Sequence, residues 1–277
     1  MVQIGKMNRL LVKGTQAYGI HLDGGAAGDI LLRDKFTAEK YQAGNEIDAF
    51  VYVDREQRLV ATTQKPSAMV GDFALLPVVT NSAAGAFMDW GLENDLFVPK
   101  SEQQDNMREG KSYVVFIFLS EKYNRITATS KLDKFLDLQP PTYAEGEEVD
   151  LLVYARTDLG YSAVVNSCHS GMIYENEVFQ KLVIGQRLQG YIKKIREDRK
   201  IDLRLQQTGY QQVDALCQTI LDTLKDRGGL VAVTDKSPPE EIYALFGVSK
   251  KVFKKAIGNL YKKRRIIIAP EGIKLVY

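Results

Sequence analysis

The sequence is poor in the residues from which metal sites and catalytic triads are commonly built. Its 277 residues include two histidines, His21 and His169, and two cysteines, Cys168 and Cys217, which lie far apart and outside any C-x-x-C spacing. A zinc site, a disulfide framework and a histidine-based active site are therefore not supported. We expect no cofactor, no metal and no catalytic residue, and so a protein that is not an enzyme.

Long hydrophobic runs are missing as well. No apolar stretch approaches the length of about 20 residues that spans a bilayer, and the first six residues lack the apolar core of a signal peptide. We therefore expect a cytoplasmic protein that contacts no membrane. The sequence does not decide the oligomeric state, although a monomer is favoured.

The C-terminal part of the chain is basic, and its segment from Ser249 to Arg265 has no acidic residue at all. Residues 208–277 carry 12 Lys and Arg against 7 Asp and Glu, whereas residues 1–207 carry 25 against 28. A solvated helix face usually mixes both signs, so cations alone predict contact with the phosphates of a nucleic acid. The cations between Ser249 and Arg265 are Lys250, Lys251, Lys254, Lys255, Lys262, Lys263, Arg264 and Arg265.

What the chain does have is an internal repeat. Three pairs of glycines, each pair 25 residues apart, stand in the same setting: Gly19 and Gly44, Gly85 and Gly110, Gly160 and Gly185. Strand-like stretches flank each glycine, and a charged turn leads into a last strand in each copy. Self-similarity of this kind indicates one small unit used three times.

Alternating apolar residues predict five short strands in each repeat, with a short helical turn in the middle, at 31–41, 98–109 and 174–182. This pattern favours a five-stranded barrel of the OB type, although an SH3-like barrel would also explain short strands. We predict a mainly β multidomain chain with three tandem OB-type barrels. Their expected ranges are residues 1–67, 68–138 and 145–207.

After residue 207 the apolar period changes from strand to helix. Val213, Leu216, Ile220 and Leu224 recur at helical spacing, and Gly228 and Gly229 follow them. Two more helices are predicted, one opened by a capping box at residues 237–240 and one capped by Ser249, and then a hairpin over 266–276. This order is typical of an α+β winged-helix domain, which we place at residues 208–277.

The barrels offer a second candidate surface. Alternation places Ala86, Met88, Leu96 and Val98 inside the second barrel and places Phe87 and Phe97 outside on adjacent strands. Two exposed rings would form a platform on which unpaired bases stack. Packing of each ring against a neighbouring repeat is the alternative. The remaining candidate contacts in the three repeats are Lys13, Tyr18, His21, Tyr161 and the cations before each last strand, Arg58, Arg125 and Lys200.

Four stretches of the sequence resemble the conserved virulence factor B (CvfB) family. They are GAFMDWGL at 85–92, DLFVPK at 95–100, GMIYENEV at 171–178 and GVSKKVFKKAIGNLYK at 247–262. The resemblance covers nearly the whole chain. It implies tandem OB domains of the ribosomal-protein-S-one type, a C-terminal winged helix, non-enzymatic RNA binding and a part in regulating gene expression and virulence.

Together the residues and the resemblance predict a protein that binds single-stranded RNA through its barrels and its basic winged helix. Two alternatives stay open. The winged helix of a DNA-binding regulator would read duplex DNA while the barrels recruit partners. A protein-docking adaptor would use both kinds of domain to hold other proteins.

Overall fold

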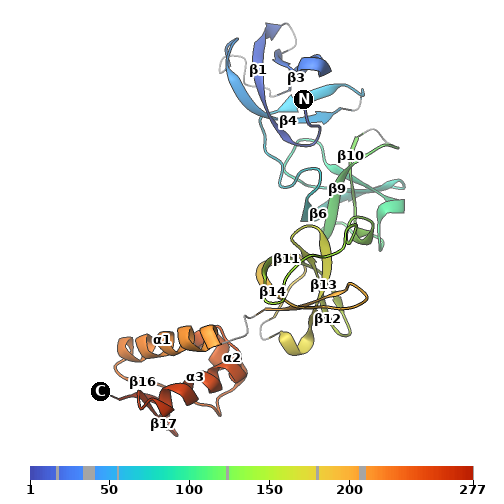
Figure 1. Ribbon diagram of the computed structural model, residues 1–277. Coiled ribbons are helices and arrows are strands. Elements are labelled where there is room, and N and C mark those ends of the chain that lie inside the picture. The colour runs from blue at the N-terminus through green and yellow to red at the C-terminus, as the bar shows by residue number, and fades with distance from the viewer. Residues whose placement is uncertain are drawn as a thin grey trace. The chain divides into compact units, whose positions relative to one another are not determined.

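The computed structural model describes residues 1–16, 19–33, 41–54, 56–122, 125–178, 181–205 and 210–276. Tyr18, one of the predicted contact residues, lies outside the described residues. The chain divides into two compact units, Met1–Leu136 and Asp137–Tyr277. The first unit holds the first two repeats, and the second unit holds the third repeat and the helical C-terminal domain (Figure 1).

The first repeat is a closed barrel of five strands. Its order is β1-β2-β3-β5-β4, and all neighbours are antiparallel except β3 and β5, which pair in parallel through Leu31 with Val60 and Leu32 with Ala61. A 3-10 turn, Gly25–Ala27, precedes β3. The strands are β1 (Met7–Gln16), β2 (Gly19–Asp23), β3 (Asp29–Leu32), β4 (Glu46–Val53) and β5 (Leu59–Thr62).

The third repeat closes in the same way, with the order β11-β12-β13-β15-β14 and a parallel pair between β13 and β15. Five strands in this order are the arrangement of the OB barrel. The strands are β11 (Glu148–Thr157), β12 (Gly160–Val165), β13 (His169–Tyr174), β14 (Arg187–Ile195) and β15 (Ile201–Arg204).

The second repeat has the same five strands but is open at one seam. Its order is β10-β9-β6-β7-β8, and no ladder of hydrogen bonds joins β8 to β10 in the described part of the chain. In the first barrel the Arg33 N–H closes this seam by donating to the Ala61 oxygen over 2.9 Å. In the second repeat Pro99 is paired with Gly85. The register of the first repeat, continued by one residue, sets Arg33 opposite Gly19, so Pro99 is the equivalent of Arg33. Proline has no N–H to donate, so this hydrogen bond is missing. The strands are β6 (Phe73–Asn81), β7 (Gly85–Met88), β8 (Leu96–Pro99), β9 (Ser112–Ser120) and β10 (Arg125–Thr129).

Each first strand is bent at the same point of the repeat. The register shifts by one residue between Val12 and Gly14 in β1, and likewise between Val78 and Thr80 in β6 and between Val153 and Ala155 in β11. A bulge of this kind increases the local twist and bends the strand. The first strand can therefore pair with β2, β7 or β12 at one end and with the fourth strand of its repeat at the other.

The predicted middle helices are shorter than expected. In the second and third repeats the segment after the third strand forms a single 3-10 turn, Lys100–Glu102 and Glu175–Glu177. Most of the corresponding segment of the first repeat lies outside the described residues. The predicted ranges were too long because polar residues support a helix as readily as a loop when no apolar face selects between them.

The C-terminal domain has three helices and a three-stranded sheet of order β16-β18-β17, which is the arrangement of a winged helix. Its core joins the inner faces of all three helices to the sheet. The fold class predicted from the sequence is thus confirmed. The elements are α1 (Tyr210–Asp226), β16 (Leu230–Val231), α2 (Pro239–Phe246), α3 (Lys250–Lys262), β17 (Ile266–Ala269) and β18 (Gly272–Leu275).

Of the two predicted helix caps, the cap at Ser249 is confirmed. Gly247 ends α2 in the left-handed conformation, and the Ser249 hydroxyl accepts a hydrogen bond from the Val252 N–H at the start of α3. The capping box at residues 237–240 is wrong. Pro238 occupies the cap position of α2, and the Ser237 hydroxyl instead accepts from the Thr234 N–H in the preceding turn.

Candidate nucleic-acid interface

Two phenylalanines form a ring pair on the outer face of the second repeat. Phe87 on β7 and Phe97 on β8 are direct partners across the two antiparallel strands, and their ring centroids lie 5.1 Å apart at 39°. Both side chains are half-buried. The Arg125 guanidinium, at the start of β10, lies 5.9 Å from the centre of the Phe97 ring. A ring pair on an outer face beside a cation suits a stacked, negatively charged nucleotide.

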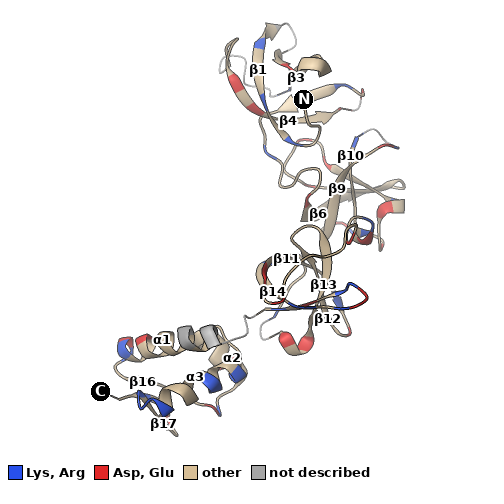
Figure 2. Cartoon of the chain, in the orientation of Figure 1, with Lys and Arg blue, Asp and Glu red and all other residues tan. Residues whose placement is uncertain are grey.

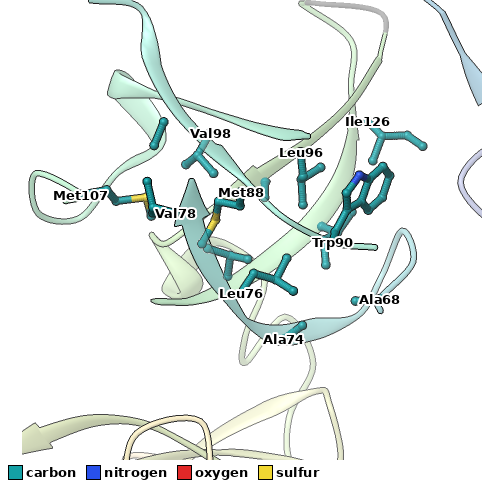
Figure 3. Packing of buried hydrophobic residues seen from close by; sticks show 14 of the residues in the cluster. Ala68, Ala74, Leu76, Val78, Met88, Trp90, Leu96, Val98, Met107 and Ile126 are labelled. Atoms are coloured by element: carbon teal, nitrogen blue, oxygen red, sulfur yellow. The ribbon is translucent and has the colours of Figure 1, made fainter. Parts of the chain in front are cut away.

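The inner residues of the same strands hold this platform in place. Ala86, Met88, Leu96 and Val98 are fully or almost fully buried, as the alternation predicted. All four belong to one buried cluster with Trp90. Figure 3 shows Met88, Leu96 and Val98 with Trp90 inside the repeat. The Trp90 indole N–H donates to the Asn94 oxygen over 2.7 Å, which ties the loop between β7 and β8 to the core. The platform therefore sits on a packed base.

The platform forms part of a cleft of about 850 Å³ between the first and second repeats. Both repeats belong to one compact unit, so the cleft is a feature of that unit. Its volume lies within the range of about 300–1,000 Å³ that is usual for small-molecule sites. The first repeat contributes Arg33, Tyr52, Val53, Asp54, Gln57 and Thr62 to Gln64, and the second contributes Phe87, Trp90, Leu92 to Phe97, Arg125 and Ile126.

The two walls of the cleft are joined by packing and by backbone hydrogen bonds. The ring of Phe50, on β4, packs edge-on against Trp90 with centroids 5.6 Å apart. The Gly5 N–H donates to the Val51 oxygen over 2.7 Å, and the Val70 N–H donates to the Gly5 oxygen over 3.1 Å. These contacts connect the strands of one repeat to the entry of the next, so the walls keep their spacing.

A buried carboxylate gathers two arginines at the cleft. The Asp54 side chain is 4% exposed and accepts from Arg33 at 2.8 Å and from Arg58 at 3.0 Å. Burial acts to raise the pKa of Asp54, but hydrogen bonds from Arg58 and from the Glu56 N–H outweigh it and hold the pKa below its ordinary value. Sequence reasoning found Arg58 but missed Arg33 and Asp54, because no spacing in the sequence connects them.

The other candidates in the first repeat are less available. The exposed Lys13 ammonium is 2.6 Å from Asp29, and this hydrogen bond raises the pKa of Lys13 and lowers that of Asp29. His21 occupies the place of Phe87, opposite Leu31 instead of a second aromatic ring. Its Nδ1 is buried and has no hydrogen-bond partner among the described residues. At the place of the Phe87–Phe97 pair, the first repeat thus has the single half-buried ring of His21 opposite an aliphatic side chain.

In the third repeat Tyr161 is a correction to the sequence prediction. Its ring is 6% exposed and belongs to the core of that barrel. Tyr161 follows Gly160 directly, as Ala86 follows Gly85 and Ile20 follows Gly19, and all three side chains point inward. Strand alternation applied in register with the second repeat would have found this. Ser162 holds the outward position, so this barrel has no equivalent of Phe87.

Three further polar or basic groups of the third barrel have partners. Lys200 is exposed but lies 3.1 Å from Asp198. His169 is buried and bonds through its two ring nitrogens to the Tyr143 hydroxyl and the Gln139 oxygen, which makes it structural. The Arg196 guanidinium stacks at 5.7 Å over the ring of Tyr174 and is bonded to Asp202.

The third helix of the winged-helix domain carries one basic face. Phe253, Ala256, Ile257 and Leu260 are buried, whereas Lys251, Lys254, Lys255, Tyr261 and Lys262 are exposed and recur at spacings of three and four residues. Blue segments mark this face on α3 and at its junction with β17 (Figure 2). The segment 249–265 therefore presents exposed cations and contains no acidic residue of its own.

Most of these cations have no ion-pair partner within the described part of the chain. Lys254 lies 3.8 Å from Asp235, and the Lys250 ammonium donates to the Lys236 oxygen at 3.3 Å. The other six are exposed and make no ion pair with a described residue. We call these six the α3 cations: Lys251, Lys255, Lys262, Lys263, Arg264 and Arg265.

The described residues contain no group of three or more His, Cys, Asp or Glu side chains that could hold a metal ion. Cys168 is exposed and Cys217 is buried, and both are free thiols. No helix among the described residues is both long and apolar enough to cross a membrane.

Known domain families match both ends of the chain. Residues 4–64 match the S1 domain, and residues 218–275 match the CvfB-like winged helix domain. The conserved virulence factor B of Staphylococcus epidermidis is 24% identical over 98% of this chain and 94% of its own length. The Bacillus subtilis protein YitL is 27% identical over 86% of this chain and 82% of its own length.

Among solved structures, the chain is similar to a multidomain protein with nucleic acid binding domains from Streptococcus pneumoniae. The identity is 24%, the match covers 99% of this chain and 98% of the other, and the TM-score is 0.43. The chain is thus related to conserved virulence factor B over nearly its full length, as its sequence motifs indicated, and it joins an S1 domain to a CvfB-like winged helix domain, both of which are nucleic-acid-binding domain types.

Proposed function

We propose that the chain is a non-enzymatic, cytoplasmic protein that binds single-stranded RNA and so regulates gene expression. The observation that carries this proposal is the paired ring platform of Phe87 and Phe97 beside Arg125. Rings on a sheet stack with unpaired bases, which a duplex keeps stacked on one another and out of reach. The α3 cations add a second surface that attracts the phosphate backbone of a nucleic acid.

The platform is tested by the double variant Phe87→Ala, Phe97→Ala. A stacked base contributes about 1–3 kcal/mol, so losing the base stacked on this ring pair should lower the affinity for an unstructured RNA of 12 nucleotides by about 5-fold to more than 100-fold. Fluorescence anisotropy of a labelled RNA measures this directly. Phe118→Ala is the matched control, because Phe118 is a half-buried ring of the same repeat that packs on Phe135 outside the cleft.

The emission of Trp90, the only tryptophan in the chain, shows whether the second repeat remains folded in each variant. A folded double variant that binds RNA with unchanged affinity would return both rings to a structural role. Competition separates RNA from DNA. Unlabelled duplex DNA that displaces the labelled RNA better than unlabelled single-stranded RNA would instead favour a regulator that binds duplex DNA through α3.

A further inference from the structure

One carboxylate stands beside the ring platform without a partner. Asp95 is the residue before β8, lines the cleft and is exposed. It makes no hydrogen bond or ion pair with any residue that the structure describes. Asp95 and Phe97 both line this cleft, and Asp95 comes directly before the strand that carries Phe97. Asp95 thus lies on the side of the repeat that carries the platform.

The other acidic groups of the cleft are occupied. Asp54 is neutralised by Arg33 and Arg58, and Glu93 has an interaction of its own. The cations facing the cleft are Arg33 and Arg125. Phosphates are repelled by Asp95 and attracted by these arginines. A nucleotide that stacks on the rings is therefore turned so that its base edge, and not its backbone, faces Asp95.

A carboxylate discriminates among base edges by the donors they present. The Watson–Crick edge of guanine carries two adjacent donors, N1–H and the N2 amino group, which match the two oxygens of a carboxylate. Adenine and cytosine each offer one amino group there. Uracil places carbonyl oxygens on both sides of its single N–H, and these oxygens are repelled by the carboxylate. Single-stranded RNA exposes this edge for reading.

From this geometry we infer that the cleft between the first two repeats takes one base and selects guanine over uracil through the Asp95 carboxylate. The inference rests on the proposed function, since it requires a base stacked on Phe87 and Phe97. It assigns to Asp95 a role in specificity and leaves most of the binding energy to the rings and the cations.

The experiment compares three labelled RNA pentamers on the full chain: UUUUU, UUGUU and UUIUU, in which inosine replaces guanosine. The wild type should bind UUGUU at least about 5-fold more tightly than UUUUU, the lower end of what a paired contact to a base contributes. Inosine keeps N1–H but lacks the amino group, so UUIUU should lie between the other two. Asp95→Asn keeps the size of the side chain and should bring the ratio of UUGUU to UUUUU close to one.

Asp48→Asn is the matched control, because Asp48 is an exposed carboxylate on β4 outside the cleft and its loss changes the net charge equally. The control should keep the wild-type ratio. A wild type that does not distinguish UUGUU from UUUUU, or an Asp95→Asn variant that keeps the full ratio, overturns the inference. If the Phe87→Ala, Phe97→Ala variant loses its affinity for RNA while Asp95→Asn keeps the wild-type ratio of affinities for UUGUU and UUUUU, the inference fails and the proposed function stands. If the double ring variant binds RNA as the wild type does, the proposed function itself fails.

Discussion

At the scale of single residues, the ionisation of Asp54 links the stability of the first unit to pH. It is almost fully buried and anchors Arg33 and Arg58 at the wall of the cleft. The lowered pKa means that the folded chain holds the charged form more tightly than the unfolded chain does. This contribution to stability is therefore present above the ordinary aspartate pKa of about 4 and is lost as the pH falls through the lower pKa of the folded state.

We predict that Asp54→Asn destabilises the first unit by about 1–3 kcal/mol at pH 7, because it weakens hydrogen bonds to two charged partners. The difference from the wild type should shrink as the pH falls through the pKa of Asp54 in the folded state, where the wild-type carboxylate also becomes neutral. Urea denaturation followed by Trp90 emission at pH 7 and at a series of lower pH values measures this. Asp48→Asn on β4, the strand that leads to Asp54, provides the control, and an equal loss in both variants would show that the buried ion pairs contribute nothing.

At the scale of the elements, the two glycines of each repeat serve different purposes. A Cβ atom on Gly85 would lie 2.2 Å from the Val98 oxygen and 2.9 Å from the Pro99 Cα, so this glycine lets β7 cross β8 closely. Gly110 instead has φ of 73° and open space around it, so it permits a left-handed turn. In each repeat, the first glycine of the pair thus allows a close approach of two strands, and the second, 25 residues later, allows a left-handed turn.

Gly85→Ala should therefore cost more than Gly110→Ala. A left-handed alanine costs about 1–2 kcal/mol, whereas the added methyl at Gly85 forces backbone atoms apart and displaces the Phe97 ring. We expect Gly110→Ala to retain RNA affinity and Gly85→Ala to lose both affinity and stability. Thermal denaturation monitored by Trp90, together with RNA anisotropy, tests this. Equal losses of stability and affinity in the two variants would contradict the assignment.

At the scale of the whole molecule, charge is divided between the units. The ring platform lies in the first unit, in a cleft that has both acidic and basic residues, and the α3 cations lie in the second. Stacking changes little with salt, whereas counterion release makes the binding of phosphates fall steeply with salt. The two surfaces should therefore differ in how ionic strength affects them.

We predict that Lys251→Gln combined with Lys255→Gln reduces the slope of log affinity against log salt by about 1.4, that is, about 0.7 for each lost contact with a single strand. The double ring variant should lower the affinity and leave the slope unchanged. Lys111→Gln combined with Lys181→Gln removes the same charge from exposed positions elsewhere and controls for net charge. An unchanged slope in the α3 variant would exclude α3 from the interface.

A feature could be predicted from the sequence when it depends on residues that are close together in the chain. Phe87 and Phe97 could be placed on the outer face because alternation along a strand is local. Tyr161 was misassigned because its aromatic character was weighed above its register with Ala86. Arg33 gave no signal, since its partner Asp54 is 21 residues away along the chain. The predicted capping box was wrong because the Ser237 hydroxyl accepts a hydrogen bond from the Thr234 N–H in the preceding turn.

The sequence by itself determined the number and kind of the modules. Apolar periodicity, paired glycines and helix caps act within a few residues of each other, so a linear pattern can express them. Only the tertiary structure decided where the site lies. The cleft joins two repeats. Among the described residues, no strand ladder closes the seam of the second repeat at Pro99, and Asp95 has no partner beside the rings. These features depend on distances between segments far apart in the chain, which no local pattern encodes.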